Sequence, residues 1–241
     1  MTTSASVENK AEKMKVLVIA PHPDDEVLGL GGTIHRLAQE GHEVVVVIAT
    51  KGWAPLYPDA QVTQARAEAR EASKVLGVGD LRFLDLPVTT LHAMPESELN
   101  KVFCDLLADV RPDWVFLPFR GDRHEDHRQI FDACMVALRP VPGEHFCQMV
   151  LAYETVSETH WNAPGIEPVF EPQYYVDITD HLSAKCEGMR AYASQVRAQP
   201  DARSIEAITA LATWRGSVIG LPAAEAFMVV RGLYAGAGAK G

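Results

Sequence analysis

The hydrophobic and polar positions of this chain follow two alternating patterns, one typical of buried strands and one typical of amphipathic helices. Lys15–Ala20 and Glu43–Thr50 are short, nearly continuous aliphatic runs, which indicate strands covered on both faces. Gln61–Leu76 instead places apolar residues on one helical face, and Gly77 is a residue that commonly ends a helix. The pattern therefore predicts strands that alternate with helices.

The same alternation continues along the rest of the chain and predicts an α/β fold. Further strands are expected at Leu81–Leu84, Trp114–Leu117, Met149–Tyr153, Tyr174–Val176 and Glu225–Val230, and further helices at Thr33–Glu40, Glu96–Val110, from residue 127 to Ala137, Asp180–Val196 and Ser204–Gly216. Right-handed crossovers between such strands give a mostly parallel sheet flanked by helices on both faces. We expect one domain over residues 14–241, preceded by a flexible polar leader, residues 1–13.

Charge and composition narrow the class of protein. The 241 residues carry 22 Lys and Arg against 32 Asp and Glu, a net charge of −10, which disfavours nucleic acid as a partner. Residues 1–13 lack the apolar segment of a signal peptide, and no apolar run reaches the ~20 residues of a membrane span. The four cysteines match no metal-binding or disulfide spacing, so we predict reduced thiols and a cytoplasmic protein.

A first polar cluster directly follows the first predicted strand. The sequence there is PHPDDE, residues 21–26, with His22, Asp24 and Asp25 at its centre. Ligands of open α/β sheets bind beyond the carboxyl ends of strands, and a histidine and a carboxylate three residues apart can reach one ion from a tight turn. The alternative is that one of the aspartates only caps the following helix.

A second polar cluster, HEDH at residues 124–127, follows the strand at Trp114–Leu117. His124 and His127 share a face if the segment is helical, and neutral imidazole is the commonest protein metal ligand. The spacing is not that of the HExxH zinc proteases. Taken alone, the cluster is equally compatible with a solvated, polar start of a helix.

Both clusters are predicted at the same edge of the sheet, where they can form one site. His22, Asp25 and His127 would supply three ligands to a zinc ion and leave a fourth position for water, as in catalytic rather than structural sites. Such a site lowers the pKa of the bound water to about 7. Asp24 is then positioned to act as the general base.

The paired motifs identify a resemblance to a known family. PHPDDE followed by Gly31-Gly32-Thr33, with HEDH about a hundred residues later, resembles the PIG-L/LmbE-like zinc-dependent N-deacetylases. The resemblance extends to Arg66-Ala67-Glu68 and to Ala224–Phe227. It implies a Rossmann-like fold and a hydrolase that removes the N-acetyl group from a GlcNAc-type sugar or conjugate, releasing acetate and a free amine.

The resemblance also implies roles for individual residues. His22, Asp25 and His127 match the zinc ligands of the family, and Asp24 matches its base. The remaining matches are His124, which would stabilise the oxyanion and assist the leaving amine, Asp126, which would orient His124, and Arg66, which would contact substrate. Many members have HPDH where this chain has HEDH. Members often assemble as trimers or hexamers, so a homo-oligomer is compatible with the resemblance.

Two other classes of function remain open at this point. One is a noncatalytic sugar- or nucleotide-binding module with a structural metal, although the glycines at Gly29, Gly31 and Gly32 do not form GxGxxG and are more typical of a turn into a helix. The other is a magnesium-dependent phosphatase that uses Asp24 and Asp25, since paired carboxylates suit hard cations. Two histidines among the ligands favour a softer metal such as zinc.

Overall fold

The predicted aliphatic runs form the middle of a seven-stranded sheet. The structure is a computed structural model that describes residues 13–143, 145 and 147–234, and its strands lie in the order β3-β2-β1-β4-β5-β7-β6. The strands are β1 (Lys15–Ala20), β2 (Glu43–Lys51), β3 (Asp80–Pro87), β4 (Trp114–Pro118), β5 (Met149–Tyr153), β6 (Tyr174–Asp177) and β7 (Ala224–Gly232). The first five are parallel to one another.

The prediction of a mostly parallel sheet is confirmed for these five strands, but the sheet as a whole is mixed. β7 pairs antiparallel with both β5 and β6. The cause lies in the connection from β6 to β7, which contains two helices. A connection with one helix carries the chain back along the sheet, so the next strand runs parallel to the previous one. A connection with two helices carries the chain back and then forward again, so the next strand runs antiparallel.

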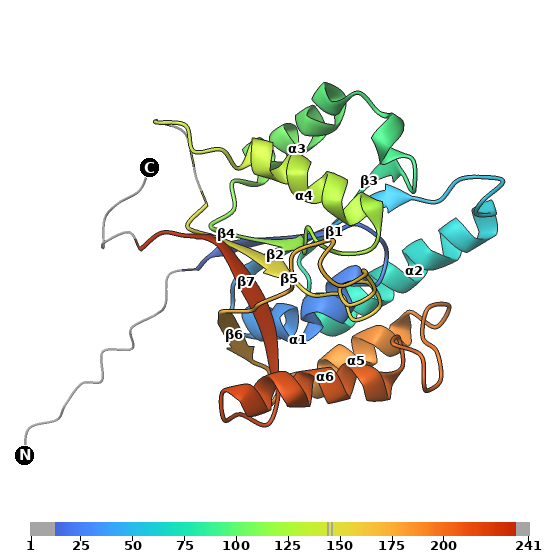
Figure 1. The fold of residues 1–241 in the computed structure, drawn as a ribbon, viewed down its shortest axis with the longest axis vertical. Coiled ribbons are helices and arrows are strands. Elements are labelled where there is room, and N and C mark those ends of the chain that lie inside the picture. Colours follow the sequence, from blue (N-terminus) through green and yellow to red (C-terminus); the bar gives the residue numbers. More distant parts are fainter. Residues whose placement is uncertain (1–12, 144, 146, 235–241) are drawn as a thin grey trace, which may run out of the picture.

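The helices cover both faces of the sheet (Figure 1). They are α1 (Asp25–Gln39), α2 (Asp59–Leu76), α3 (Glu96–Val110), α4 (Glu125–Ala137), α5 (Leu182–Ala191) and α6 (Ile205–Val218), with a short 3₁₀ turn at Leu91–Ala93. Val16 and Val18 of β1 join the core beneath α1, α2, α5 and α6, whereas Leu17 joins the core beneath α3 and α4. Burial of successive side chains on opposite faces explains why the strand is aliphatic throughout.

Helix α1 begins at Asp25 rather than at Thr33, and it is broken at Leu30, whose φ is −148° and ψ is 28°. Tertiary partners satisfy the backbone groups that the break leaves free. The Lys185 ammonium donates to the Leu28 carbonyl at 2.9 Å, and the Glu225 carboxylate accepts the N–H of Thr33 at 2.6 Å. The sequence pattern detected only the half of α1 that follows this break.

The glycines before Thr33 lie inside α1, not in a turn before it. A Cβ on Gly29 would lie 2.3 Å from Cδ2 of Tyr153, and one on Gly32 would lie 2.8 Å from Ile178. The buried Tyr153 also donates its hydroxyl proton to the Ile19 carbonyl at 2.9 Å. Close packing of α1 against β5 therefore requires a residue without a side chain at position 29.

Other sequence predictions have mixed outcomes. Helix α5 ends at Ala191 instead of Val196, because the chain then turns into a segment that packs against α2. The predicted leader, residues 1–13, lies outside the described residues apart from Lys13. The four cysteines are free, and three of them are buried. In the described part of the chain, no helix combines the length and the apolar character needed to cross a bilayer.

The packing of Gly29 gives a stability prediction. Gly29→Ala should lower the free energy of unfolding by about 1–3 kcal/mol, because the added methyl group forces Tyr153 or the α1 backbone to shift. Gly79→Ala is the matched control, since its Cβ would meet only the Val44 carbonyl oxygen at 3.8 Å. Urea unfolding measures both; equal stabilities for the two variants would contradict the packing argument.

Candidate active site

The two polar clusters meet where the strand order reverses. β1 and β4 are parallel neighbours, and the chain leaves β1 toward β2 on one side and β4 toward β5 on the other. Such a reversal leaves a crevice beyond the carboxyl ends of the two strands. His22 and Asp25 follow β1, and His127 lies in the first turn of α4 after β4. The fold thus brings together residues that are far apart in the sequence.

Three donor atoms of these residues form a nearly equilateral triangle. Nδ1 of His22 lies 3.2 Å from Oδ2 of Asp25, and Nε2 of His127 lies 3.2 Å from the same oxygen. The two nitrogens are 3.3 Å apart. A tetrahedral zinc ion with bonds of about 2.0–2.1 Å places its ligand atoms roughly 3.3–3.4 Å apart. The three side chains form a group that could hold a metal ion, and their spacing fits a tetrahedral one.

Two further carboxylates hold the histidines from outside the triangle. Oδ2 of Asp122 lies 2.7 Å from Nδ1 of His127, and Oδ2 of Asp126 lies 3.0 Å from Nε2 of His22. Asp122 is itself fixed by the hydroxyl of Thr159, which donates to it at 2.6 Å. A carboxylate on the outer nitrogen keeps a proton there, so the lone pair of the inner nitrogen points into the triangle.

The centre is buried and rich in negative charge. Asp25, Asp122 and Asp126 are at most 2% exposed, and His127 is fully buried. Burial opposes the protonation of His127, but the charges and hydrogen bonds of Asp25 and Asp122 outweigh it and raise the pKa of the ring to about 10. Buried carboxylates require a compensating positive charge. A divalent cation among the three donor atoms would supply that charge and replace the proton on His127.

A second group of residues with ligand-like spacing is less suited to a metal. It consists of His22, His124 and Asp126. Nδ1 of His124 lies 3.8 Å from Oδ2 of Asp126, and the same nitrogen accepts the backbone N–H of Asp126 at 3.2 Å, as the N-cap of α4. The carboxylate of Asp126 therefore holds His22, and it is the backbone of Asp126, rather than its carboxylate, that orients His124.

The same hydrogen bond fixes the proton of His124. Burial and the neighbouring His22 lower the pKa of His124 to about 4, so the ring is neutral at neutral pH. Because Nδ1 accepts the backbone N–H of Asp126, the single ring proton is on Nε2. His124 lines the cavity described below, so its side chain is available as a hydrogen-bond donor there.

The backbone of Asp24 is strained, and its buried side chain does not cap the helix that follows. It is the N-cap residue of α1, yet its side chain makes no capping hydrogen bond, and its φ of 102° is unusual for a residue other than glycine. Such strain costs about 1–3 kcal/mol and is concentrated at functional sites. The Glu26 carboxylate holds the segment by accepting the Asp24 N–H at 3.2 Å and the Tyr192 hydroxyl at 2.6 Å.

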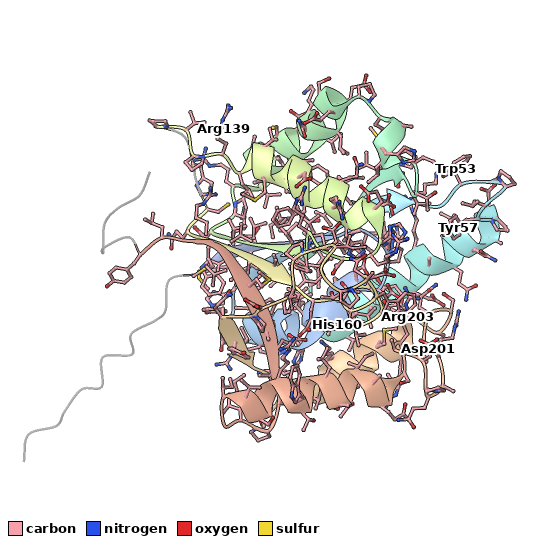
Figure 2. The ribbon with its side chains drawn as sticks, in the orientation of Figure 1. Trp53, Tyr57, Arg139, His160, Asp201 and Arg203 are labelled. Carbon is pink, nitrogen blue, oxygen red and sulfur yellow. The ribbon has the colours of Figure 1, made fainter. Side chains whose placement is uncertain are left out.

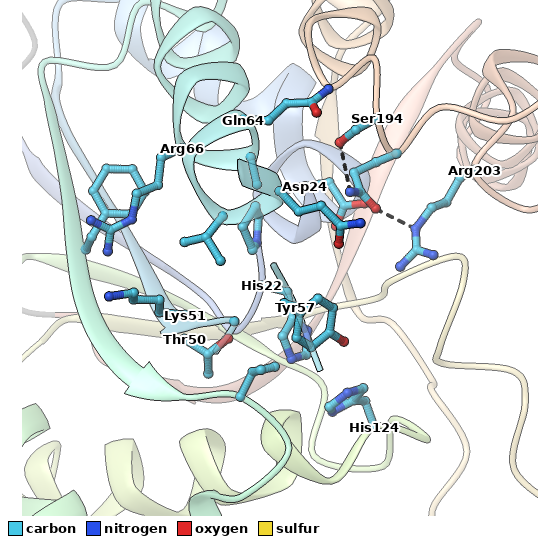
Figure 3. A pocket seen from close by; sticks show the side chains of 18 of the residues that line it. His22, Asp24, Thr50, Lys51, Tyr57, Gln64, Arg66, His124, Ser194 and Arg203 are labelled. Atoms are coloured by element: carbon cyan, nitrogen blue, oxygen red, sulfur yellow. Dashed lines mark hydrogen bonds and ion pairs between the residues drawn. The ribbon is translucent and has the colours of Figure 1, made fainter. Parts of the chain in front are cut away.

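The surroundings of Asp24 combine opposing electrostatic effects. Burial and the neighbouring Asp25 charge raise the pKa of Asp24, and the guanidinium of Arg203 opposes them. Nε of Arg203 lies 3.1 Å from Oδ2 of Asp24 (Figure 3). Of the two adjacent aspartates, Asp25 belongs to the triangle, whereas Asp24 lies outside it and lines the cavity.

A cavity of about 500 Å³ opens in front of the centre. Its lining includes His22, Asp24 and His124, but neither Asp25 nor His127, which lie behind. One wall belongs to β2, β3 and α2, and the other to the segment between α5 and α6. Figure 2 shows Tyr57 beside the first of these walls and Arg203 on the second. A substrate in the cavity would therefore meet the triangle on one side only.

Arg66 lines this cavity from α2, at some distance from the triangle. Its guanidinium forms an ion pair with Asp85 and lies over the ring of Phe83, 4.7 Å from the centroid. Asp85 has a positive φ of 58°, at a point where β3 carries an extra residue relative to β2. Such bulges redirect side chains. The position of Arg66 in the wall is compatible with the contact to substrate that the sequence predicts.

Two residues of the site were not found from the sequence. Asp122 comes five positions before His127, and a carboxylate close to a histidine ligand is a signal that could have been used. Arg203 has no such signal, because it reaches Asp24 from a distant, irregular segment. That segment is anchored by the buried Glu68 of α2, which accepts the hydroxyl of Ser194 at 2.6 Å.

Comparison with known proteins identifies the family. The sequence model of PIG-L, described as GlcNAc-PI de-N-acetylase, matches residues 17–138. The diacetylchitobiose deacetylase of Thermococcus kodakarensis is 30% identical over 194 residues, which cover 75% of this chain and 70% of that protein. The chain belongs to the PIG-L family, and the resemblance seen in the motifs is confirmed.

Two other proteins show the range of the similarity. The 1D-myo-inositol 2-acetamido-2-deoxy-alpha-D-glucopyranoside deacetylase of Kineococcus radiotolerans is 28% identical over an alignment that covers 82% of this chain and 73% of that protein. The structure of the N,N'-diacetylchitobiose deacetylase of Pyrococcus horikoshii with an inhibitor superposes with a TM-score of 0.73 at 27% identity, covering 91% and 84% of the two chains. These relatives are deacetylases of N-acetylated amino sugars.

The triangle predicts that the protein is stabilised by a divalent metal. Zinc at about 100 times its dissociation constant should raise the free energy of unfolding by about 2.7 kcal/mol, or the melting temperature by roughly 5–10 °C. His127→Asn should abolish this rise, whereas His92→Asn, at an exposed position, should retain it. Thermal melts with zinc and with a chelator measure the effect. A rise of equal size in all three proteins would show that the metal binds elsewhere.

Proposed function

We propose that this protein is a zinc-dependent hydrolase that removes the acetyl group from an N-acetylated amino sugar or sugar conjugate. The observation that carries the proposal is the triangle of donor atoms of His22, Asp25 and His127, with Asp24 and His124 on its cavity side. Membership of the PIG-L family and the activities of the relatives support the same reaction.

The donor set favours zinc as the resident metal. His22, Asp25 and His127 would hold it with two nitrogens and one oxygen, which suits zinc better than magnesium. When bound, the ion would lower the pKa of a water ligand and polarise the amide carbonyl of the substrate. The carboxylates of Asp122 and Asp126 would keep both histidines in the tautomer that metal binding requires.

The residues on the cavity side would move the protons of the reaction. Asp24 would accept a proton from the attacking water, and the Arg203 guanidinium would hold its carboxylate in place. The Nε2–H of His124 would donate a hydrogen bond to the oxygen that becomes negatively charged as the amide carbonyl is attacked. Collapse then requires a proton on the amide nitrogen. Asp24, protonated in the first step, can supply it, whereas a neutral His124 can only donate a hydrogen bond.

The rival functions make different use of the same residues. A magnesium phosphatase would require Asp24 and Asp25 to face one ion together, whereas the ligand-like group around Asp25 contains two histidines and not Asp24. A noncatalytic binding module would have no use for a strained, buried carboxylate on the cavity wall. The cytoplasmic location and the oligomeric state stay predictions from the sequence.

The direct test is acetate release from a set of substrates. The purified protein is incubated with N-acetylglucosamine, N,N'-diacetylchitobiose, glycosidic conjugates of N-acetylglucosamine and phosphorylated sugars, with zinc and with a chelator. We expect acetate and a free amine in equal amounts from at least one of them, only when metal is present. Phosphate release from phosphorylated sugars without acetate release would support the phosphatase instead.

The role of Asp24 gives a sharper prediction. Asp24→Asn should lower kcat by roughly 10²–10⁴-fold, because the amide cannot accept the proton of water. The fold should persist, since asparagine tolerates a positive φ, and zinc measured by elemental analysis should remain near one per chain. Asp180→Asn, at an exposed position, serves as the control. Turnover within a few-fold of the wild type would remove Asp24 from the role of base.

A further inference from the structure

The charge of the cavity differs from that of the protein as a whole. The chain has a net charge of −10, yet the cavity lining contains four cationic side chains against two carboxylates. The cationic residues are Lys51, Arg66, Arg197 and Arg203, and the carboxylates are Asp24 and Glu158. A cluster of cations inside a cleft of an acidic protein attracts anionic ligands specifically to that cleft.

Two of the four cations on this lining already have partners within the protein. Arg203 forms an ion pair with Asp24. Arg197 donates to the backbone carbonyls of Ser194 and Val196 at 2.8 Å and 3.1 Å. Both arginines belong to the segment between α5 and α6. The Arg203 contact links this segment to Asp24, whereas the Arg197 contacts lie within the segment. The opposite wall of the cavity carries the other two cations.

On that opposite wall, Lys51 and Arg66 converge at the carboxyl end of β3. Lys51 is the last residue of β2 and lies in register with Pro87, while Arg66 pairs with Asp85 of the same strand. Figure 3 shows both side chains on the same side of His22, across the cavity from Arg203. Lys51 is exposed at the cavity wall, and its ammonium has no ion-pair or hydrogen-bond partner among the described residues.

Arg66 is well suited to act with Lys51. Its ion pair with Asp85 and its stacking on Phe83 fix the plane of the guanidinium, so little side-chain entropy is lost when a ligand binds. Arg66 and Asp85 neutralise each other, and Lys51 supplies the net positive charge of this wall. An arginine in a fixed plane and an unpaired ammonium on the same wall form an arrangement that can bind phosphate or carboxylate oxygens.

We propose that Lys51 and Arg66 form a binding site for an anionic group, a phosphate or a carboxylate, on the part of the substrate that lies beyond the N-acetylated sugar. The inference rests on the proposed function and narrows it, because it makes an anionic conjugate a better substrate than a neutral one. The acetyl group then lies at the triangle, and the anion lies on the wall formed by β2, β3 and α2.

The test compares matched substrates that differ in charge. Acetate release is measured for the neutral methyl glycoside of N-acetylglucosamine, for N-acetylglucosamine 1-phosphate and for the malate glycoside of N-acetylglucosamine. We expect kcat/KM to be at least about tenfold higher for one or both anionic substrates, as one charge-assisted contact allows. The two anionic arms distinguish a phosphate from a carboxylate.

Variants assign the preference to this wall of the cavity. Lys51→Gln should lower the ratio of kcat/KM for the anionic substrate to that for the methyl glycoside by about tenfold. Lys101→Gln, at an exposed position on α3, should leave the ratio unchanged, which controls for the change in net charge. Equal kcat/KM for all three substrates, or a preference lost in Arg197→Gln and not in Lys51→Gln, would overturn the inference.

A binding measurement separates this inference from the proposed function. Isothermal titration calorimetry gives the Kd of N-acetylglucosamine 1-phosphate and of the methyl glycoside for the wild type and for Lys51→Gln. If no substrate releases acetate, the proposed function fails. Tighter binding of the phosphate by the wild type than by the variant would still support the anion site, and equal values of Kd would refute it.

Discussion

The parallel pairing of β1 with β4 is the constraint on which the rest of the site depends. It places the residues after β1 beside the residues after β4, at the point where the strand order reverses. Neither segment holds a triangle of donor atoms alone, since His22 and Asp25 come from one and His127 from the other. The buried aliphatic residues of both strands maintain this pairing. The packing of the hydrophobic core therefore also determines the geometry of the candidate active site.

Charge balance is the second requirement of this arrangement. Burying carboxylates costs several kcal/mol each unless they are paired and hydrogen-bonded. Asp122 and Asp126 meet this need through His127 and His22, and Asp24 meets it through Arg203. Each of these contacts also orients a group that the proposed reaction uses. The buried negative charge that lowers the stability of the metal-free protein would therefore favour the binding of a cation at the site.

The sequence was sufficient for those features that depend on local pattern. Aliphatic runs located the parallel strands, and two short motifs located the clusters at their ends. It was insufficient where tertiary partners decide the structure: the break of α1 at Leu30 depends on Lys185 and Glu225, and Arg203 reaches Asp24 from a segment without a pattern of its own. The direction of β7 was not predicted, although the two helices before it were: the sequence pattern does not show which strands β7 pairs with, and the general expectation of parallel crossovers was applied to it.

The cavity would determine which substrates reach the triangle. The two polar clusters form its floor, and its walls come from segments that differ in charge and composition. Anomalous diffraction at the zinc edge, on crystals of the metal-loaded protein, tests the central claim most directly. We expect one strong peak within about 2.3 Å of Nδ1 of His22, Oδ2 of Asp25 and Nε2 of His127. A peak held by other residues, or these three side chains directed away from one another, would contradict the account.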